Sequence, residues 1–415
     1  MKSALVLPSS DGPEAKLTVG EAAIRSSAPW VRALRDGGFD GLVLRWGDEI
    51  IIPGADLSPL PDQYSQADAV RFGYRVEPTE LLASQKEWLV TDDHQTVRAE
   101  LPRQPLARLT DRIADLIGGG SVHVNLGSFA ASHNLLKALL EAFGDLLDQD
   151  QLGANWDPYV WMALHSDDEN TWEAACHAEP DVKPTELTSL LNVIPDLWAR
   201  AQRAKEHLAK VTGRELTVKL LDFGEPYWFD AGNHASLRAG LNHIFQAGRD
   251  GETIRAFLGL PEGLAQGESY VDHSAIAPGI SLSNSVVIGS EINGAGSVVN
   301  KAIIVNSRVS TLQVGAGGIV LECECSDLTV DSPSGFAFRL SGAAHVSGDE
   351  VAAEIGPLPD NMRLSYFGAA KVLDDDAYSA KLGANRISFR EAADVVAQLD
   401  PSKGLDSSGG LLSND

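Results

Sequence analysis

Residues 270–309 read Tyr270-Val-Asp-His-Ser-Ala-Ile-Ala-Pro-Gly-Ile-Ser-Leu-Ser-Asn-Ser-Val-Val-Ile-Gly-Ser-Glu-Ile-Asn-Gly-Ala-Gly-Ser-Val-Val-Asn-Lys-Ala-Ile-Ile-Val-Asn-Ser-Arg-Val309. Charged residues are sparse here, and apolar residues recur at intervals near six, at Ile276, Leu282, Ile288, Ile292, Val298 and Val309. A short rung with this pattern cannot bury its apolar face alone, so rungs stack, with small residues at the corners. The stretch predicts a β-solenoid, and an antiparallel β-sandwich is the alternative.

Before this stretch, short apolar strands alternate with helices. Strands are predicted at 4–7 and 42–46, and helices at 29–35, 134–147 and 187–208. Such alternation favours an α/β domain, Rossmann-like, with a mainly parallel sheet covered on both faces. We expect this domain to span 1–265 and the β-helix 266–345. A C-terminal extension, 346–415, is expected to hold a helix at 389–399 and a disordered tail.

Charge and composition exclude several classes of function. The 415 residues include 58 acidic and 33 basic ones, a net charge of -25, which disfavours binding to nucleic acid or anionic membranes. No apolar run is long enough to span a bilayer, and the N-terminal apolar run ends at Pro8, too soon for a secretory signal. We expect a cytoplasmic protein with no nucleic-acid or membrane partner. Its three cysteines lack zinc-like spacing and are expected to be reduced packing residues.

One further segment has a pattern that points to chemistry, Phe223-Gly-Glu-Pro-Tyr-Trp-Phe-Asp-Ala-Gly-Asn233, directly before a helix-like stretch. Asp230 stands between an aromatic triplet and a small-residue turn, beside the N–H dipoles of the helix start. An aspartate in this setting can ligate a divalent cation at a phosphate. The alternative is a helix N-cap at Asn233 that follows a buried aromatic strand.

The order of these features resembles the sugar-1-phosphate nucleotidyltransferases that carry a left-handed β-helix. The resemblance covers the chain up to about Leu328. Gly47-Asp-Glu-Ile50 resembles the family's Gly-Asp-Asn or Gly-Asp-Val element, and the segment 67–78 resembles its Val-Glu-x-Pro strand and turn. Val124-Asn-Leu-Gly-Ser-Phe-Ala130 resembles Asn-x-Gly-x-Tyr, and Tyr227-Trp-Phe-Asp-Ala-Gly-Asn233 is similar to Trp-x-Asp-x-Gly-Thr.

The resemblance implies nucleotidyl transfer from a nucleoside triphosphate to a sugar-1-phosphate, giving a nucleotide sugar and pyrophosphate. Asp48 and Asp230 would hold Mg²⁺, which neutralises charge between two phosphates that repel each other. With Lys16 they form the implied catalytic set. The implied substrate-binding residues are Gly12, Arg103, Asn125, Gly127 and Trp228.

Two stretches depart from the family's pattern. The glycine-rich loop that wraps the triphosphate corresponds here to residues 9–17, where Gly12 and Lys16 are candidate remnants, Pro13 removes a donor and Glu14 adds repulsion. The family's Glu-Lys-Pro becomes Arg103-Gln-Pro105, so Gln104 replaces the lysine and Arg103 stands beside it.

These departures keep a second hypothesis open, a catalytically inactive relative that binds sugar phosphate or acts as a regulatory or assembly subunit. A third, a solenoid acyltransferase, would depend on His273. In each case we expect a homo-oligomer formed through the β-helix.

Overall fold

The computed structural model describes most of the chain. The described residues are 6–9, 16–116, 120–147, 157–166, 168–176, 191–192, 194–231, 234–333, 335–348, 350–358, 362–369, 379–381 and 385–397. Packing divides the chain into two compact units. Residues 1–24, 47–50 and 227–415 form one, which we call the solenoid unit, and residues 25–46 and 51–226 form the other, which we call the sheet unit. The domain boundaries at 265 and 345, which follow sequence texture, stay predictions.

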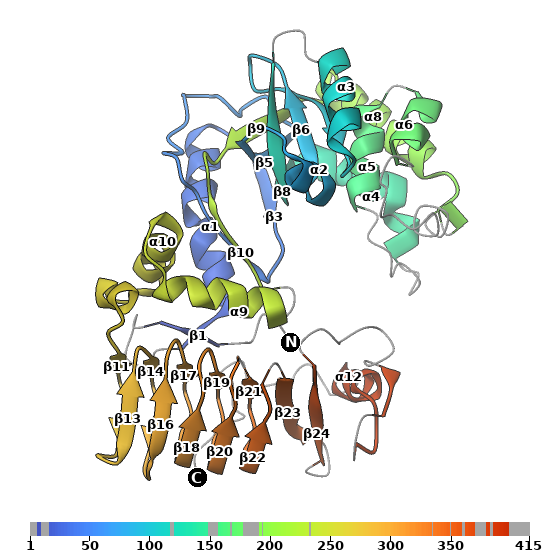
Figure 1. Ribbon diagram of the computed structural model, residues 1–415. Coiled ribbons are helices and arrows are strands. Elements are labelled where there is room, and N and C mark those ends of the chain that lie inside the picture. The colour runs from blue at the N-terminus through green and yellow to red at the C-terminus, as the bar shows by residue number, and fades with distance from the viewer. Residues whose placement is uncertain are drawn as a thin grey trace. The chain divides into compact units, whose positions relative to one another are not determined.

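The sheet unit contains a six-stranded sheet in the order β7-β6-β8-β5-β9, with β3 also paired to β8. Its strands are β3 (Gly41–Leu44), β5 (Ala69–Arg75), β6 (Trp88–Thr91), β7 (Val97–Leu101), β8 (Ser121–Ser132) and β9 (Val218–Asp222). Its helices are α2 (Glu80–Gln85), α3 (Leu106–Leu116), α4 (His133–Leu147), α5 (Asp157–His165), α6 (Glu169–Cys176) and α8 (Leu197–Thr212). Figure 1 shows these helices and strands in blue to green.

The α/β class predicted for this half is confirmed, and both faces of the sheet are covered. Side chains of α4, α5, α6 and α8 share one core with Ala69 and Leu220 of the sheet. On the opposite face Phe72 of β5 meets Trp30, with ring centroids 5.3 Å apart. The alternation of side chains along β5 explains why residues 69 and 72 belong to different layers.

The strand pairing is mixed rather than mainly parallel. The ladder between β5 and β9 is parallel, whereas β3–β8, β5–β8, β6–β7 and β6–β8 are antiparallel. The short polar turn after Thr91 accounts for one of these ladders, because a connection of this length can only reverse the chain and so joins β6 to β7 as a hairpin. The three antiparallel ladders of β8 join strands that are distant in the sequence.

Helix α1 (Val19–Asp36) begins ten residues before the predicted start at Pro29 and ends where predicted. The amide of Gly37 donates to the Ala33 carbonyl and that of Gly38 to the Arg35 carbonyl, so the two glycines close the helix. The predicted helices at 134–147 and 389–399 are confirmed as α4 and α12 (Phe389–Ala397). The tail after residue 397 lies outside the described residues.

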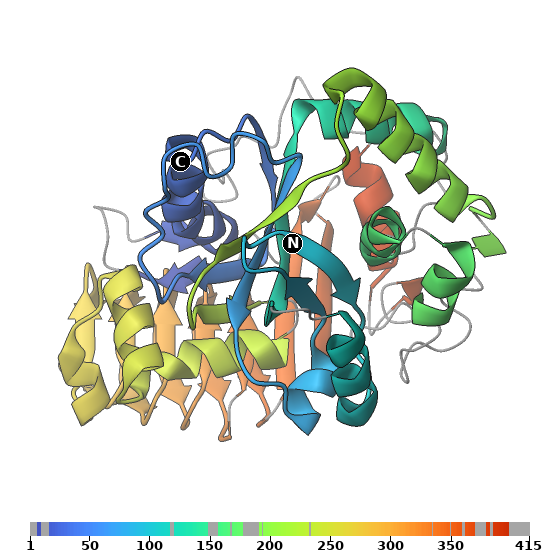
Figure 2. The same ribbon diagram turned by 90° about the horizontal axis from the view of Figure 1, so that it is seen from above.

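The solenoid unit begins with the hairpin β1 (Val6–Pro8) and β2 (Lys16–Thr18). It continues with β4 (Glu49–Ile52, shared with the other unit), β10 (Tyr227–Asp230), α9 (His234–Asn242), η2 (His243–Phe245), α10 (Arg249–Leu258) and η3 (Glu262–Gln266). The solenoid strands are β11 (Tyr270–Asp272), β12 (Ala275–Ile276), β13 (Ile280–Ser283), β14 (Val286–Ile288), β15 (Glu291–Ile292), β16 (Gly296–Val299), β17 (Ile303–Val305), β18 (Arg308–Val314), β19 (Ile319–Leu321), β20 (Glu324–Val330), β21 (Phe336–Phe338), β22 (Ser341–Val346), β23 (Glu350–Leu358) and β24 (Met362–Ala369). In Figures 1 and 2, helix α9 runs across these strands.

The predicted β-solenoid is confirmed, with a period that corrects the interval of six. Parallel ladders place Tyr270, Val286, Ile303, Ile319, Phe336 and Val351 beside one another in turn. One turn therefore takes 15 to 17 residues, fewer than three strict intervals of six. The inward side chains Leu282, Val287 and Ile292 lie five residues apart, which accounts for the shortfall. Gly289 takes a φ of 61° at the tight corner between the last two. Beyond the last parallel ladder, β24 pairs antiparallel with β23.

A ladder of hydroxyl groups satisfies the backbone at one corner of the solenoid. The amide of Ser290 donates to Ser274 Oγ (3.0 Å), that of Ser307 to Ser290 Oγ (3.1 Å), and that of Cys323 to Ser307 Oγ (3.1 Å). The hydroxyls of Ser290 and Ser307 each donate in turn to the carbonyl two residues earlier. Ser therefore recurs in the sequence because buried corner amides need partners. Gly and Asn recur where the corner backbone takes a positive φ, as at Asn284, Gly289 and Asn306. The cysteines are buried free thiols.

Candidate functional site

The two aspartates of the expected metal site are neighbours across two strands. Asp230 ends β10, and Asp48 lies in the turn before β4. Strands β10 and β4 pair with each other, and the amide of Ala231 donates to the Asp48 carbonyl at 2.8 Å. Strand spacing of about 4.8 Å puts the two backbones within well under a nanometre. The Asp48 side chain is half-buried and that of Asp230 is exposed, so both positions adjoin solvent.

A third acid, Glu49, follows Asp48 at the start of β4 and was missed by the sequence analysis. Its side chain is buried, and its Oε1 accepts from Trp228 Nε1 at 3.2 Å. Residues two apart on a strand share a face, so Trp228 and Asp230 point to the same face of β10, where Glu49 also lies. Asp48 is in a turn, where strand alternation does not fix its direction. The missed signal is an acid within the apolar strand Glu49–Ile52.

The side chains at this site could hold a magnesium ion through two carboxylates, those of Asp48 and Asp230. Within the described residues, no three His, Cys, Asp or Glu side chains converge as a metal cluster. Mg²⁺ is commonly held by one or two carboxylates, with substrate phosphates and water completing its coordination. Asp48 and Asp230 match that requirement in ligand type and number.

Residues 9–17, which correspond to the family's glycine-rich loop, follow β1 and end in β2, the two strands of a hairpin. Lys16 pairs with Pro8 and Leu17 with Leu7 in an antiparallel ladder, while Gly12 and Pro13 lie outside the described residues. Ser9, fully buried, donates its hydroxyl to the Leu258 carbonyl at 3.1 Å.

The helix that follows this hairpin carries its own cap. Thr18 Oγ1 accepts from the Glu21 amide at 3.2 Å, and Glu21 Oε2 accepts from the Thr18 amide at 2.8 Å. This reciprocal pair is a capping box. It satisfies donors at the start of α1 and adds a carboxylate where a phosphate would bind in a helix N-terminal site.

Asn125 and Gly127, expected at the sugar, lie in a bulge of β8 in the sheet unit. Asn125 opposes Gly73 and Phe129 opposes Arg71, so β8 has three intervening residues where β5 has one. The buried Asn125 side chain donates to Glu87 Oε2 (3.2 Å) and accepts from the Gly127 amide (3.0 Å). Gly127 has a φ of 77°, a conformation that favours glycine. Asn125 therefore shapes the bulge through both ends of its amide.

Arg103 and Gln104 take opposite environments just after β7. Arg103 is exposed, whereas Gln104 is fully buried, and its backbone amide donates to the Ala83 carbonyl at 3.0 Å. In the described part of the chain, neither Gln104 amide atom has a hydrogen-bond partner. The position that holds a lysine in the resembling family thus faces the interior here.

Comparisons with known proteins found matches among solved structures. No protein-family model matches the chain, and no curated protein matches it. A solved structure described as mannose-1-phosphate geranyltransferase from Thermus thermophilus is 14% identical, with 92% of this chain and 75% of that chain covered and a TM-score of 0.24. So low a TM-score supports no inference about this chain. Among the described residues, no helix combines the length and apolarity needed to cross a bilayer.

Proposed function

We propose that the chain transfers a nucleotidyl group from a nucleoside triphosphate to a sugar-1-phosphate, releasing pyrophosphate. The observation that supports this best is the hydrogen bond from the Ala231 amide to the Asp48 carbonyl. It joins the residue after Asp230 to Asp48, although the two acids are remote in sequence. Both acids come from motifs that resemble the family's metal-binding elements. A cytoplasmic location and assembly into homo-oligomers through the β-helix belong to the same proposal.

The chemistry sets what these side chains must do. A sugar-1-phosphate oxygen attacks the α-phosphorus while the bond to pyrophosphate breaks, so two anions must approach each other. Bound Mg²⁺ would supply the positive charge that offsets this repulsion. Asp48 and Asp230 would hold it, and Trp228 would border the substrate beside them. Lys16, Gly12 and Arg103 remain the proposed phosphate contacts, and Asn125 and Gly127 the proposed sugar contacts.

A second function is favoured by a separate observation. The capping box of Thr18 and Glu21 occupies the start of α1, and a helix start occupied in this way is a poor triphosphate site. That supports a non-catalytic protein that binds sugar phosphate or acts as a regulatory or assembly subunit.

Pyrophosphate release separates the two functions. The full chain would be assayed with Mg²⁺ against a panel of nucleoside triphosphates and sugar-1-phosphates. Transfer predicts turnover with at least one pair and a loss of about a hundredfold or more in Asp48→Asn and Asp230→Asn. Asp40→Asn, an exposed acid in the other unit, is the matched control. Absence of turnover with every pair, together with thermal stabilisation by a sugar phosphate alone, would establish the binder instead.

A further inference from the structure

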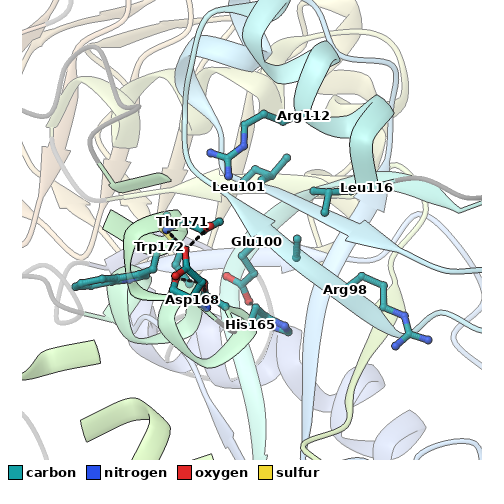
Figure 3. A pocket seen from close by; sticks show the side chains of 12 residues that line it. Arg98, Glu100, Leu101, Arg112, Leu116, His165, Asp168, Thr171 and Trp172 are labelled. Atoms are coloured by element: carbon teal, nitrogen blue, oxygen red, sulfur yellow. Dashed lines mark hydrogen bonds and ion pairs between the residues drawn. The ribbon is translucent and has the colours of Figure 1, made fainter. Parts of the chain in front are cut away.

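The sheet unit contains a pocket that none of the expected site residues lines. It has a volume of about 290 Å³, at the lower end of the range for small-molecule sites. Strand β7, helix α3, and helices α5 and α6 enclose it, as Figure 3 shows. Its walls are partly apolar and partly charged. The apolar part is made by Leu101, Leu116, Met162 and Trp172.

The apolar wall is preformed. Met162 and Trp172 are buried, and the Trp172 Nε1 donates to the Tyr159 carbonyl at 3.1 Å, which fixes the ring. Leu101 is also buried, while Leu116 is 42% exposed and stands at the rim. A bound apolar group would therefore cover surface on Leu116 without needing to move the other three side chains.

Arg112 is the cation of the pocket that has no anionic partner among the described residues. It projects from α3 toward the pocket (Figure 3) and is half-buried. Arg108, one helical turn earlier, also forms no ion pair among the described residues. Burial and the charge of Arg108 lower the pKa of Arg112. The other arginine of the lining, Arg98, is already bound to Asp92 through two hydrogen bonds. A half-buried cation facing a like charge gains free energy when an anion binds it.

The acids of the lining are already engaged. Arg71 Nε lies 2.8 Å from Glu100 Oε1, and Arg71 Nη2 donates to Oε2 at 3.0 Å. Asp168 caps α6, because its Oδ2 accepts from both the amide and the hydroxyl of Thr171 at 2.7 Å. These hydrogen bonds reduce the repulsion that the two carboxylates exert on an incoming anion.

His165 closes the polar end of the pocket. Its side chain is 9% exposed, with Nε2 at 3.7 Å from Glu100 Oε1, beyond hydrogen-bond distance. No hydrogen bond satisfies Nε2 within the described part of the chain. A buried polar atom left in this state is costly, and such atoms concentrate at sites completed by a ligand or water.

We propose that this pocket binds a small organic oxyanion, a carboxylate or phosphate ester with an apolar or aromatic body. The oxyanion lies at Arg112, and the body covers Leu101, Leu116, Met162 and Trp172. Charge-assisted hydrogen bonds to the guanidinium and burial of the apolar body act together, so each alone binds weakly. This site is independent of Asp48 and Asp230, which lie in the other unit.

Titration calorimetry with four probes tests the proposal. Phenyl phosphate and benzoate carry both parts of the ligand, inorganic phosphate only the charge, and benzyl alcohol only the body. We expect saturable binding of phenyl phosphate or benzoate, and at least tenfold weaker binding of inorganic phosphate and of benzyl alcohol. No saturation by either aromatic anion at roughly 10 mM would overturn the proposal, since that is weaker than a millimolar site.

Variants then locate the site. Arg112→Gln should weaken binding of the aromatic anion about tenfold or more, because a charged partner is replaced by a neutral one. Leu116→Ala should weaken it severalfold through lost apolar contact, and its rim position leaves folding intact. Arg35→Gln, at an exposed pair with Asp36, is the matched control and should bind as the parent does. Unchanged affinity in Arg112→Gln would show that the anion binds elsewhere and would overturn the assignment.

Discussion

Replacement of His165 by glutamine should remove a specific part of the pH dependence of stability. His165 ends α5, and burial, helped by the charges of Arg71 and Lys205, lowers its pKa from 6.5 to about 3. Below pH 6.5 the unfolded chain therefore binds a proton that the native chain does not bind. The free energy of unfolding falls as the pH falls, by up to ~1.4 kcal/mol per pH unit, and stability is fullest above pH 6.5. Between pH 7 and pH 5.5 this amounts to about 1.3 kcal/mol.

Urea unfolding at pH 7, 6.2 and 5.5, followed by tryptophan fluorescence, measures the effect. The wild-type chain should lose about 1.3 kcal/mol more than His165→Gln over this interval. His133→Gln is the matched control, with a side chain 61% exposed, and should keep the wild-type slope. The interval stays above pH 5.5 so that carboxylates such as Asp145 and Asp196, whose pKa values are lowered by Arg200, remain ionised. Equal slopes in wild type and His165→Gln would refute a buried neutral histidine.

Three further substitutions test separate parts of the fold by urea unfolding. Gly127→Ala should cost about 1–2 kcal/mol, because an alanine is strained at a φ of 77° and its Cβ would lie 3.2 Å from Trp46 Nε1; no loss would contradict the bulge. Asp68→Asn should lower the free energy of unfolding by roughly 3 kcal/mol, because it leaves Arg214 without its buried carboxylate partner. A loss below about 1 kcal/mol would mean that the ion pair is solvated. Ser307→Ala should cost about 1–2 kcal/mol, because the Cys323 amide loses its acceptor. The control Ser281→Ala, on an exposed part of β13, should be nearly neutral, and equal losses in both variants would contradict the corner ladder.

The solenoid could be predicted because its physics is local and repeated. Apolar residues such as Ile276, Ile292 and Val309 occupy equivalent positions in successive turns, so the pattern survives changes in spacing. The true period was hidden because the interval of six counted Ile288, whereas the inward side chain of that strand is Val287. The inward side chains Leu282, Val287 and Ile292 are five residues apart, so a strict interval of six fails there.

The pairing of the sheet could be predicted only in part. The antiparallel ladder of β6 and β7 is the part that the sequence encodes locally, because the short polar turn after Thr91 can only reverse the chain. The partners of β8 depend on contacts between segments distant in the sequence, and strand patterns do not encode them. The resulting sheet is mixed, although its helices alternate with strands as in a parallel one.

The sequence analysis predicts a metal site at Asp48 and Asp230, which the structure brings next to each other, and it did not single out Glu49. A buried acid in a strand is visible in sequence only as a break in an apolar run, and its partner Trp228 is remote along the chain. The capping box has a signature in the sequence, Thr18-Val-Gly-Glu21, in which a threonine is followed by a glutamate three residues later. His165 and Arg112 come together through helices whose packing no local motif predicts.

Binding of Mn²⁺, measured by the loss of the free-ion electron paramagnetic resonance signal, tests the central claim that Asp48 and Asp230 share one divalent cation. The full chain should show one site beyond weak surface binding, and Asp48→Asn and Asp230→Asn should each weaken it about tenfold or more, with Asp40→Asn unchanged. Glu49→Gln, measured beside them, reports whether the buried acid contributes. An Mn²⁺ site that keeps its affinity in the Asp48→Asn, Asp230→Asn double variant would contradict the claim.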